Sequence, residues 1–353
     1  MTQTHTRTGL TPQVHLSPAA AKRMWLVSAC ALAPILQSSL SDGFSSLFIA
    51  AVAVAAALAA ELILDAGAGR FSLGDGSAVA SALILTLLLP NTINPLVPAV
   101  ASFFAIMVVK QSFGGLGANW FNPAIGGWLL ARVSWPTLFA ASLGSSPLVL
   151  LESSVSKGLG DPSGSPLAVL KIAGYKPSAL DAAWTAQANG NVLSAIGVEL
   201  SGGYLDLFAP AQAGIIADRG LAALVLATIV LLASGSSKSF IPAVFLGAFL
   251  AAVRLGGALP YGGALGGGDM LFALLTGGTV LAAFLLAADP ATGPKSNLGA
   301  VGAAVFAGIL AYFLRFPGSE PYGAALAVGC VNALVPIVRR LERRALYLSW
   351  RTR

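Results

Sequence analysis

Residues 45–64 read SSLFIAAVAVAAALAAELIL, a run of twenty residues with one charged side chain, Glu61. A helix of about 20 apolar residues matches the hydrocarbon thickness of a bilayer. Outward from this run, further apolar stretches are bounded mostly by Pro, Gly or charged residues. The ten candidate spans lie at about 24–40, 44–64, 77–90, 94–112, 122–142, 219–234, 240–257, 269–288, 297–316 and 322–338. The sequence therefore predicts an all-α polytopic membrane protein with about ten transmembrane helices.

The composition of the whole chain favours the same fold class. Of 353 residues, 56% are apolar and 10% are charged, whereas soluble domains carry about 25% charged residues. This excludes a soluble enzyme and a disordered chain, and the scattered basic residues argue against a nucleic-acid-binding protein. His5 and His15 lie in the N-terminal tail, and Cys30 and Cys330 are far apart. Neither a metal site nor a disulfide framework is predicted, so function must come from loops and bound groups.

The basic residues predict how the chain is oriented. With the N-terminus in the cytoplasm and ten spans, 13 of the 20 Lys and Arg residues lie inside, 6 lie outside and Arg132 lies within a span. Five spans on each side of one long loop predict a 5+5 inverted repeat. The predicted segments are a cytoplasmic tail (1–21), a first membrane half (22–142), an external loop (143–218), a second half (219–340) and a basic cytoplasmic tail (341–353).

The stretch Lys110–Ala124, KQSFGGLGANWFNPA, is the most distinctive candidate site. Its glycines allow close backbone approach, its amides can donate and accept, and Trp120 and Phe121 offer flat faces, a mixture that suits a planar heterocycle with polar edges. A tight turn between helices is the alternative interpretation. The candidate binding residues are Gly114, Gly115, Gly117, Asn119 and Asn122.

Two further loops are candidates. Asp289–Pro294, DPATGP, follows the eighth span on the same predicted side, and its Asp289 and Thr292 make a rigid polar turn. The alternative is a simple helix stop. The external loop contains Gly160–Leu167, GDPSGSPL, where a hydroxyl on a small-residue turn can carry a covalent group. The alternative there is an ordinary surface turn.

These residues carry a resemblance to a known family. From about residue 20 to 340, the chain resembles RnfD, a membrane component of the Rnf electron-transport complex, which is related to NqrB of the sodium-translocating NADH:quinone reductase. The resemblance rests on Asp75–Ala78 with the run to Pro90, on Lys110–Ala124, on Asp289–Pro294 and on Tyr322–Pro336. The second of these stretches is long enough to be highly specific, and it outweighs the simple-turn interpretation.

The resemblance implies a membrane subunit of a redox-driven ion pump in the bacterial inner membrane, a translocase subunit that is not catalytic alone. Family members hold FMN through a phosphoester to a Thr hydroxyl in an external loop, attached by a flavin transferase, and a second flavin, riboflavin, is associated with this type of subunit. The implied partners are membrane lipid and the iron–sulfur and flavin subunits of the complex. Aligned on the family motif, Ser165 takes the attachment position, with Gly164 in place of Ala and Ser163 in place of Gly. An alignment with a one-residue gap instead keeps Ser163 and Gly164 in register with the Ser/Thr-Gly of the family and still leaves Ser165 as the acceptor.

A second departure lies at 205–220, where the family often carries a Gly-Glu-Thr-Ser-type segment. Asp218 can stand in for the acidic residue, but the hydroxyl pair is missing. The function that we expect is electron transfer coupled to cation movement, with flavin supplying the redox chemistry. Glu61, Asp65, Arg132 and Asp289 are the ionisable candidates, and Na⁺ or H⁺ stays open. The alternatives are a cofactor-free permease or channel and a flavin-less scaffold subunit.

Overall fold

The protein is described here by a computed structural model that covers residues 20–69, 72–115, 117–143, 166–172, 175–197, 199–208, 210, 214–235, 238–256, 266–317 and 320–351. Within these ranges the secondary structure is helical, with no strand. Five helical stretches are long and apolar enough to cross a membrane: Ala20–Asp42, Ser45–Gly67, Leu96–Phe113, Asn297–Arg315 and Gly323–Arg344. The predicted all-α polytopic fold is confirmed.

The first half begins with the two long helices α1 and α2, and the π-helix η2 continues directly from α4. Its elements are α1 (Ala20–Asp42), α2 (Ser45–Ala68), η1 (Leu73–Asp75), α3 (Ser77–Leu87), α4 (Leu96–Phe104), η2 (Ala105–Lys110), η3 (Gln111–Phe113), α5 (Pro123–Ser134) and α6 (Pro136–Leu143). The connecting segment then contains α8 (Pro166–Ile172), α9 (Ala179–Ala188), η4 (Asn189–Leu193), η5 (Ser194–Ile196) and η6 (Leu205–Phe208).

The second half contains two long helices, α15 and α16, and several shorter ones. Its elements are α10 (Ile216–Arg219), α11 (Leu221–Ala233), α12 (Phe240–Gly256), α13 (Met270–Leu275), α14 (Thr279–Leu281), η7 (Ala282–Ala287), α15 (Asn297–Arg315) and α16 (Gly323–Arg351). The predicted basic tail 341–353 therefore continues α16 as far as Arg351, because this stretch has no Gly or Pro to end the helix.

Two of the expected spans are broken. The span expected at 122–142 divides between α5 and α6, because Pro136 cannot donate the hydrogen bond that would continue α5. The span expected at 269–288 is interrupted after α13, where Gly277 and Gly278 adopt φ of +68° and +63°. Only glycine adopts two such conformations in succession without strain, so the chain turns here before α14 begins.

The helices of the two halves pack in the same order. In the first half α2 packs against α3 and α4, and α4 packs against α5; in the second, α12 packs against η7 and α15, and α15 against α16. The start of α3 and the end of η7 meet at one cleft, which both Ser77 and Ala288 line. The 5+5 inverted repeat stays a prediction.

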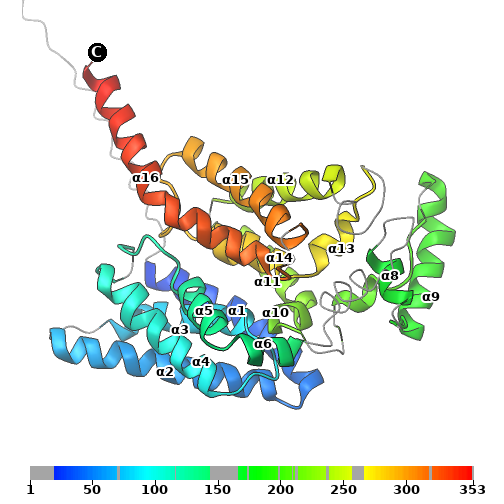
Figure 1. The fold of residues 1–353 in the computed structure, drawn as a ribbon, viewed down its shortest axis with the longest axis horizontal. Helices are drawn as coiled ribbons and strands as arrows, with labels where there is room; N and C mark the ends of the chain where they lie inside the picture. The colour runs from blue at the N-terminus through cyan, green and yellow to red at the C-terminus, as the bar shows by residue number, and fades with distance from the viewer. Residues whose placement is uncertain are drawn as a thin grey trace, which may run out of the picture.

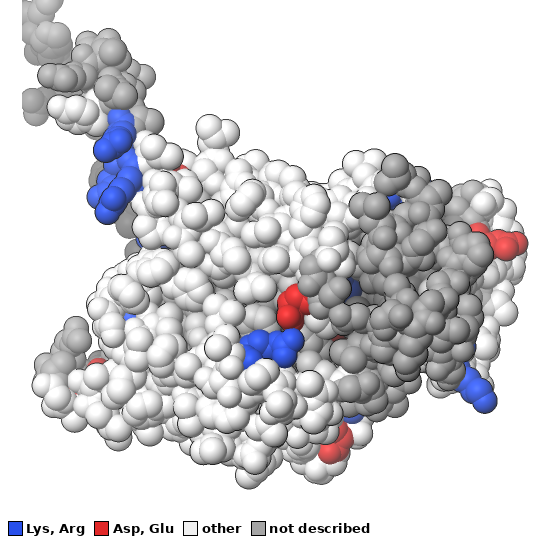
Figure 2. Space-filling model, viewed as in Figure 1, with Lys and Arg blue, Asp and Glu red and all other residues white. Residues whose placement is uncertain are grey.

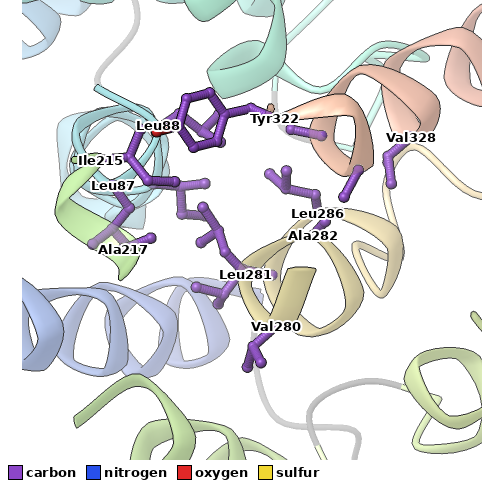
Figure 3. Packing of buried hydrophobic residues seen from close by; sticks show 14 of the residues in the cluster. Leu87, Leu88, Ile215, Ala217, Val280, Leu281, Ala282, Leu286, Tyr322 and Val328 are labelled. Atoms are coloured by element: carbon purple, nitrogen blue, oxygen red, sulfur yellow. The ribbon is translucent and has the colours of Figure 1, made fainter. Parts of the chain in front are cut away.

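The core joins the two halves at the middle of the bundle. Leu87 and Leu88 at the end of α3 pack with Ile215, Leu281 and Tyr322 of the second half (Figure 3). The segment after α3 also bonds to the entry of the second half, since the Asn91 N–H donates to the Gly214 carbonyl at 3.2 Å and the Ile216 N–H donates to the Leu89 carbonyl at 3.0 Å. The segment after α3 and the segment at the start of α10 therefore satisfy each other's backbone hydrogen-bonding groups.

The bundle has two distinct ends. The last part of α16 projects from one end, and α8 and α9 lie at the other (Figure 1). Lys238 and Arg339 gather at the α16 end, where both donate to carbonyls of the 291–295 segment. At the opposite end Arg132 pairs with Glu320 and Arg219 donates to Ser41. The assignment of the α16 end to the cytoplasm stays a prediction.

Some charged residues that were expected in loops are buried in the structure. Lys110, Arg219 and Arg315 are 3%, 3% and 4% exposed, although the orientation argument counted them as loop residues. Arg132, expected within a span, has 27% of its side chain exposed. Figure 2 shows mostly uncharged residues on this face of the bundle, with one small group of charged residues near its middle and others towards its edges. A largely uncharged surface fits contact with lipid.

Candidate functional site

The Lys110–Ala124 stretch forms a tight loop that begins where the π-helix η2 ends. Gly114, Gly115 and Gly117 have φ of +103°, +85° and +86°, so each requires glycine. The loop is closed by the Gly115 N–H, which donates to the Lys110 carbonyl at 3.2 Å. In the structure these three glycines shape the turn, and they are not among the residues that line the adjacent cleft.

Asn122 connects this loop to both halves of the protein. As the N-cap of α5, its Oδ1 accepts from the N–H groups of Ala124 at 2.9 Å and Ile125 at 3.4 Å, which satisfies donors that a helix start leaves open. Its Nδ2 donates to Oδ2 of Asp289 at 3.4 Å. The structure therefore brings together the two loops that the sequence singled out separately.

Asp289 begins a compact turn after η7, the other π-helix that leads into a candidate loop. Its carboxylate accepts from the Ala291 N–H at 3.0 Å and from the Thr292 hydroxyl at 3.1 Å. Burial raises the pKa of the Asp289 carboxyl, and these hydrogen bonds oppose the rise. Arg339 of α16 donates to the carbonyls of Ala291 and Gly293 at 2.6 and 2.8 Å. Thr292 thus acts by supporting Asp289, and it does not line the cleft.

A cleft that is partly open to the surroundings lies between the halves at this end. Its polar lining consists of Arg23, Ser77, Ser81, Lys110, Asn119, Asn122 and Asp289. Two buried polar atoms of this lining, Oδ1 of Asn119 and Nε of Arg23, have no hydrogen-bond partner among the described residues. Buried polar atoms are nearly always paired, so these two atoms lack the partner that such atoms usually have.

A cluster of buried charged residues lies next to the cleft and includes Lys110 of its lining. Nζ of Lys110 donates to Oε1 of Glu61 at 2.5 Å, and both residues are buried. The Ser72 hydroxyl lies 2.9 Å both from Oε1 of Glu61 and from Oδ1 of Asp65. One hydroxyl has one proton, so it can donate to only one of these two carboxylates at a time. Glu61 and Asp65, expected at the end of the second span, therefore form one interacting group.

The opposite end of the bundle holds a second polar cluster that the sequence did not reveal. Asp218 accepts from the N–H groups of Gly277 at 2.9 Å and Gly278 at 2.8 Å, directly at the break before α14. Arg315 donates to the Ala273 carbonyl at 2.5 Å and to the hydroxyls of Thr276 and Thr279. Asp218, considered above as a substitute for a family acidic residue, therefore holds the break between α13 and α14 in place.

The predicted flavin anchor, Ser165, lies outside the described residues, as do Ser163 and Gly164. The described part of the same segment starts at Pro166 with α8. It is held by buried Asp181, which accepts from the N–H groups of Gly203 at 2.5 Å and Asp206 at 3.1 Å. The segment after α8 therefore has an internal polar framework of its own.

Comparison with known proteins places this geometry in a family. The model of the NQR2, RnfD, RnfE family matches residues 7–347. The RnfD component of the proton-translocating ferredoxin:NAD(+) oxidoreductase complex of Clostridium ljungdahlii is 28% identical over 94% of this chain and 93% of its own. The corresponding component of the Na(+)-translocating complex of Acetobacterium woodii is 26% identical over 95% and 93%.

A third relative is the RnfD component of the ion-translocating oxidoreductase complex of Shewanella amazonensis, which is 30% identical over 84% of each chain. The family match covers both membrane halves and the segment between them. The chain belongs to the NQR2, RnfD, RnfE family.

Proposed function

We propose that this chain is the membrane subunit of an ion-translocating oxidoreductase complex and that it carries flavin, with FMN attached covalently to Ser165. The relatives named above are RnfD components of complexes that translocate H⁺ or Na⁺ with ferredoxin and NAD(+) as redox partners, which supports the general function. Side chains alone do not supply a redox centre, so a bound cofactor would carry the electrons. As a subunit it would act with iron–sulfur and flavin subunits and would not be catalytic alone.

The choice of Ser165 rests on the sequence motif and on its position. Serine offers the same hydroxyl oxygen as threonine for a phosphoester, and residues 163–165 directly precede α8. The described part of this segment lies at the end of the bundle opposite to the projecting part of α16 (Figure 1). A flavin transferase acting on the outer side of the bacterial inner membrane would reach this segment if the α16 end is cytoplasmic.

We also propose that the cleft binds a second, non-covalent flavin, riboflavin. The observation that carries this proposal is the pair of unpartnered buried atoms in its lining, Oδ1 of Asn119 and Nε of Arg23. An isoalloxazine ring has a polar edge with both donors and acceptors and an apolar body. The apolar lining of α3 and η7, which includes Ile84 and Phe284, would contact the body while the two polar atoms pair with the edge. Bound there, a flavin supplies one-electron and two-electron redox chemistry.

The experiment for the covalent group is in-gel fluorescence. The chain is produced in cells that express a flavin transferase, denatured, separated on a gel and viewed under ultraviolet light. Wild-type chain is expected to give a fluorescent band, and Ser165→Ala is expected to give none. Ser163→Ala is the matched control, because it changes a hydroxyl two residues away and should leave the band bright.

A dark wild-type band from such cells contradicts covalent FMN and favours the cofactor-free permease or the flavin-less scaffold. A band that fades in Ser163→Ala but stays in Ser165→Ala moves the attachment to the other serine. Ion transport is tested separately, by measuring Na⁺ and H⁺ uptake into vesicles that contain the assembled complex. Wild-type uptake that depends on reduced ferredoxin or NADH distinguishes the redox pump from a permease.

A further inference from the structure

The part of α16 that projects from the bundle has two different faces. Arg339 and Glu342 face the body of the protein, where they bond to the 291–296 segment. Arg340, Arg343, Arg344 and Tyr347 are spaced three, four and seven positions apart, which places them on one helix face, and together they line a shallow groove. All four side chains are exposed. Figure 2 shows the basic atoms gathered on this projecting part of the molecule.

The three arginines of this groove have no acidic partner among the described residues. Neither of the two ion pairs found there involves them, and the neighbouring Glu342 accepts from the Ser296 hydroxyl at 2.6 Å on the other side of the helix. Like charges one helical turn apart destabilise a helix. An external anion that neutralises this face would therefore stabilise the projecting part of α16.

The position of the groove along α16 indicates which anion it meets. Before and among these arginines, the adjoining side of the helix exposes Leu334, Ile337 and Leu341, which are 43%, 56% and 57% exposed. In a membrane helix such side chains face lipid tails. The step from Ile337 to Arg344 is seven residues, or about 10 Å of helix. The polar layer on each side of the hydrocarbon core is roughly 5–8 Å deep, so this step is long enough to carry the helix from the tails into the headgroups. The apolar surface thus changes to arginine over the distance at which tails give way to headgroups.

We propose that Arg340, Arg343, Arg344 and Tyr347 form a binding surface for anionic phospholipid headgroups. Each guanidinium can donate two parallel hydrogen bonds to phosphate oxygens, and tyrosine is favoured at the membrane–water interface. An acidic protein surface offers the same charge, but it does not explain why the exposed apolar stripe leads directly into the arginines. The surface is independent of the flavin sites, which lie elsewhere in the chain.

The test measures lipid preference of the full-length chain in neutral detergent. Dye-labelled phosphatidylglycerol and dye-labelled phosphatidylcholine are each titrated with protein, and binding is followed by fluorescence anisotropy. Each arginine near a membrane surface contributes about fivefold in affinity for anionic lipid, so Arg340→Gln/Arg343→Gln/Arg344→Gln should lower the affinity for phosphatidylglycerol about 100-fold. The weak binding of phosphatidylcholine should not change.

Two matched variants make the result specific. Lys171→Gln/Lys176→Gln removes two exposed cations at the opposite end of the bundle and should keep the preference. Replacement of the three arginines by Lys keeps their charge and should retain most of it. The proposal is overturned if the triple Gln variant still prefers phosphatidylglycerol, or if the wild-type preference does not weaken in high salt. Tighter, arginine-dependent binding of polyglutamate would instead assign the surface to an acidic protein.

Discussion

The ammonium group of Lys110 lies 2.5 Å from Oε1 of Glu61, and the two side chains are 3% and 1% exposed. Lys110 is the last residue of η2, and the candidate loop with Asn119 and Asn122 begins directly after it. Glu61 lies on α2, so this ion pair fixes the start of the loop to the first half of the bundle. The shape of the cleft therefore depends on a charge pair that no sequence motif identified.

Removal of one partner of this pair is expected to destabilise the protein strongly. Lys110→Met leaves the Glu61 carboxylate buried without its cation, and such a change lowers the free energy of unfolding by about 3 kcal/mol. The measurement is denaturant unfolding in detergent micelles. The double variant Glu61→Gln/Lys110→Met should recover part of the loss, because it leaves no unpaired charge.

Arg132 and Glu320 provide the control for this prediction. Their pair is longer, at 3.3 Å, and both side chains are about a quarter exposed (27% and 25%). Exposed pairs contribute less than about 1 kcal/mol, so Arg132→Gln should have a small effect. Equal losses for Arg132→Gln and Lys110→Met would show that burial of the Lys110 pair does not determine its contribution.

Two glycines of α15 should respond in opposite ways to a methyl group. A Cβ on Gly308 would lie 2.5 Å from the carbonyl oxygen of Phe245 in α12, whereas a Cβ on Gly302 meets nothing within 4 Å. Gly308→Ala must push α12 and α15 apart and should lower the melting temperature. Gly302→Ala should stabilise α15 by about 0.5–1 kcal/mol, because alanine is the better helix former. A Gly308→Ala protein as stable as wild type would contradict this close helix packing.

Apolar run lengths in the sequence were sufficient to predict the membrane fold, because burial in lipid requires long helices whatever they pack against. They were insufficient to locate the breaks. At the break, the N–H groups of Gly277 and Gly278 donate to Asp218, about sixty residues earlier in the chain. An interaction that depends on distant residues leaves no periodic signal in the chain, and only the adjacent glycines were a local indication.

Only part of the candidate site was predictable from the sequence. Asn119, Asn122 and Asp289 were selected from two separate loops, and they line one cleft. Arg23 was missed because it precedes the first apolar run, where a basic residue is ordinary evidence of orientation. Lys110 and Arg315 also stand at the ends of apolar runs. Sequence position alone does not distinguish a buried cation there from one that lies in a loop.

Alkaline pH should destabilise the segment between the two membrane halves. Burial, together with the nearby Asp206 and Asp181 carboxylates, raises the pKa of Tyr175 to about 12, above the ordinary value of about 10. The folded state therefore retains this proton when the unfolded chain loses it, so stability is full below about pH 10 and falls between pH 10 and 12. Tyr175→Phe should weaken this fall in pH-dependent unfolding monitored by proteolysis of the segment. An unchanged slope would rule out Tyr175 as its source.

The cleft proposal predicts that Asn119 determines how much non-covalent flavin the purified chain retains. In Asn119→Leu the acceptor Oδ1 is lost, and a polar edge bound there would stay buried without its partner, which costs about 1–3 kcal/mol, or roughly 5- to 150-fold in affinity. The measurement is flavin released by acid from purified protein, per mole of chain. Asn332→Leu is the matched control, because Asn332 is also buried but lines a different cavity among α15 and α16. If both variants retain as much flavin as wild type, the cleft is not the binding site. If both lose it equally, the loss reflects general destabilisation.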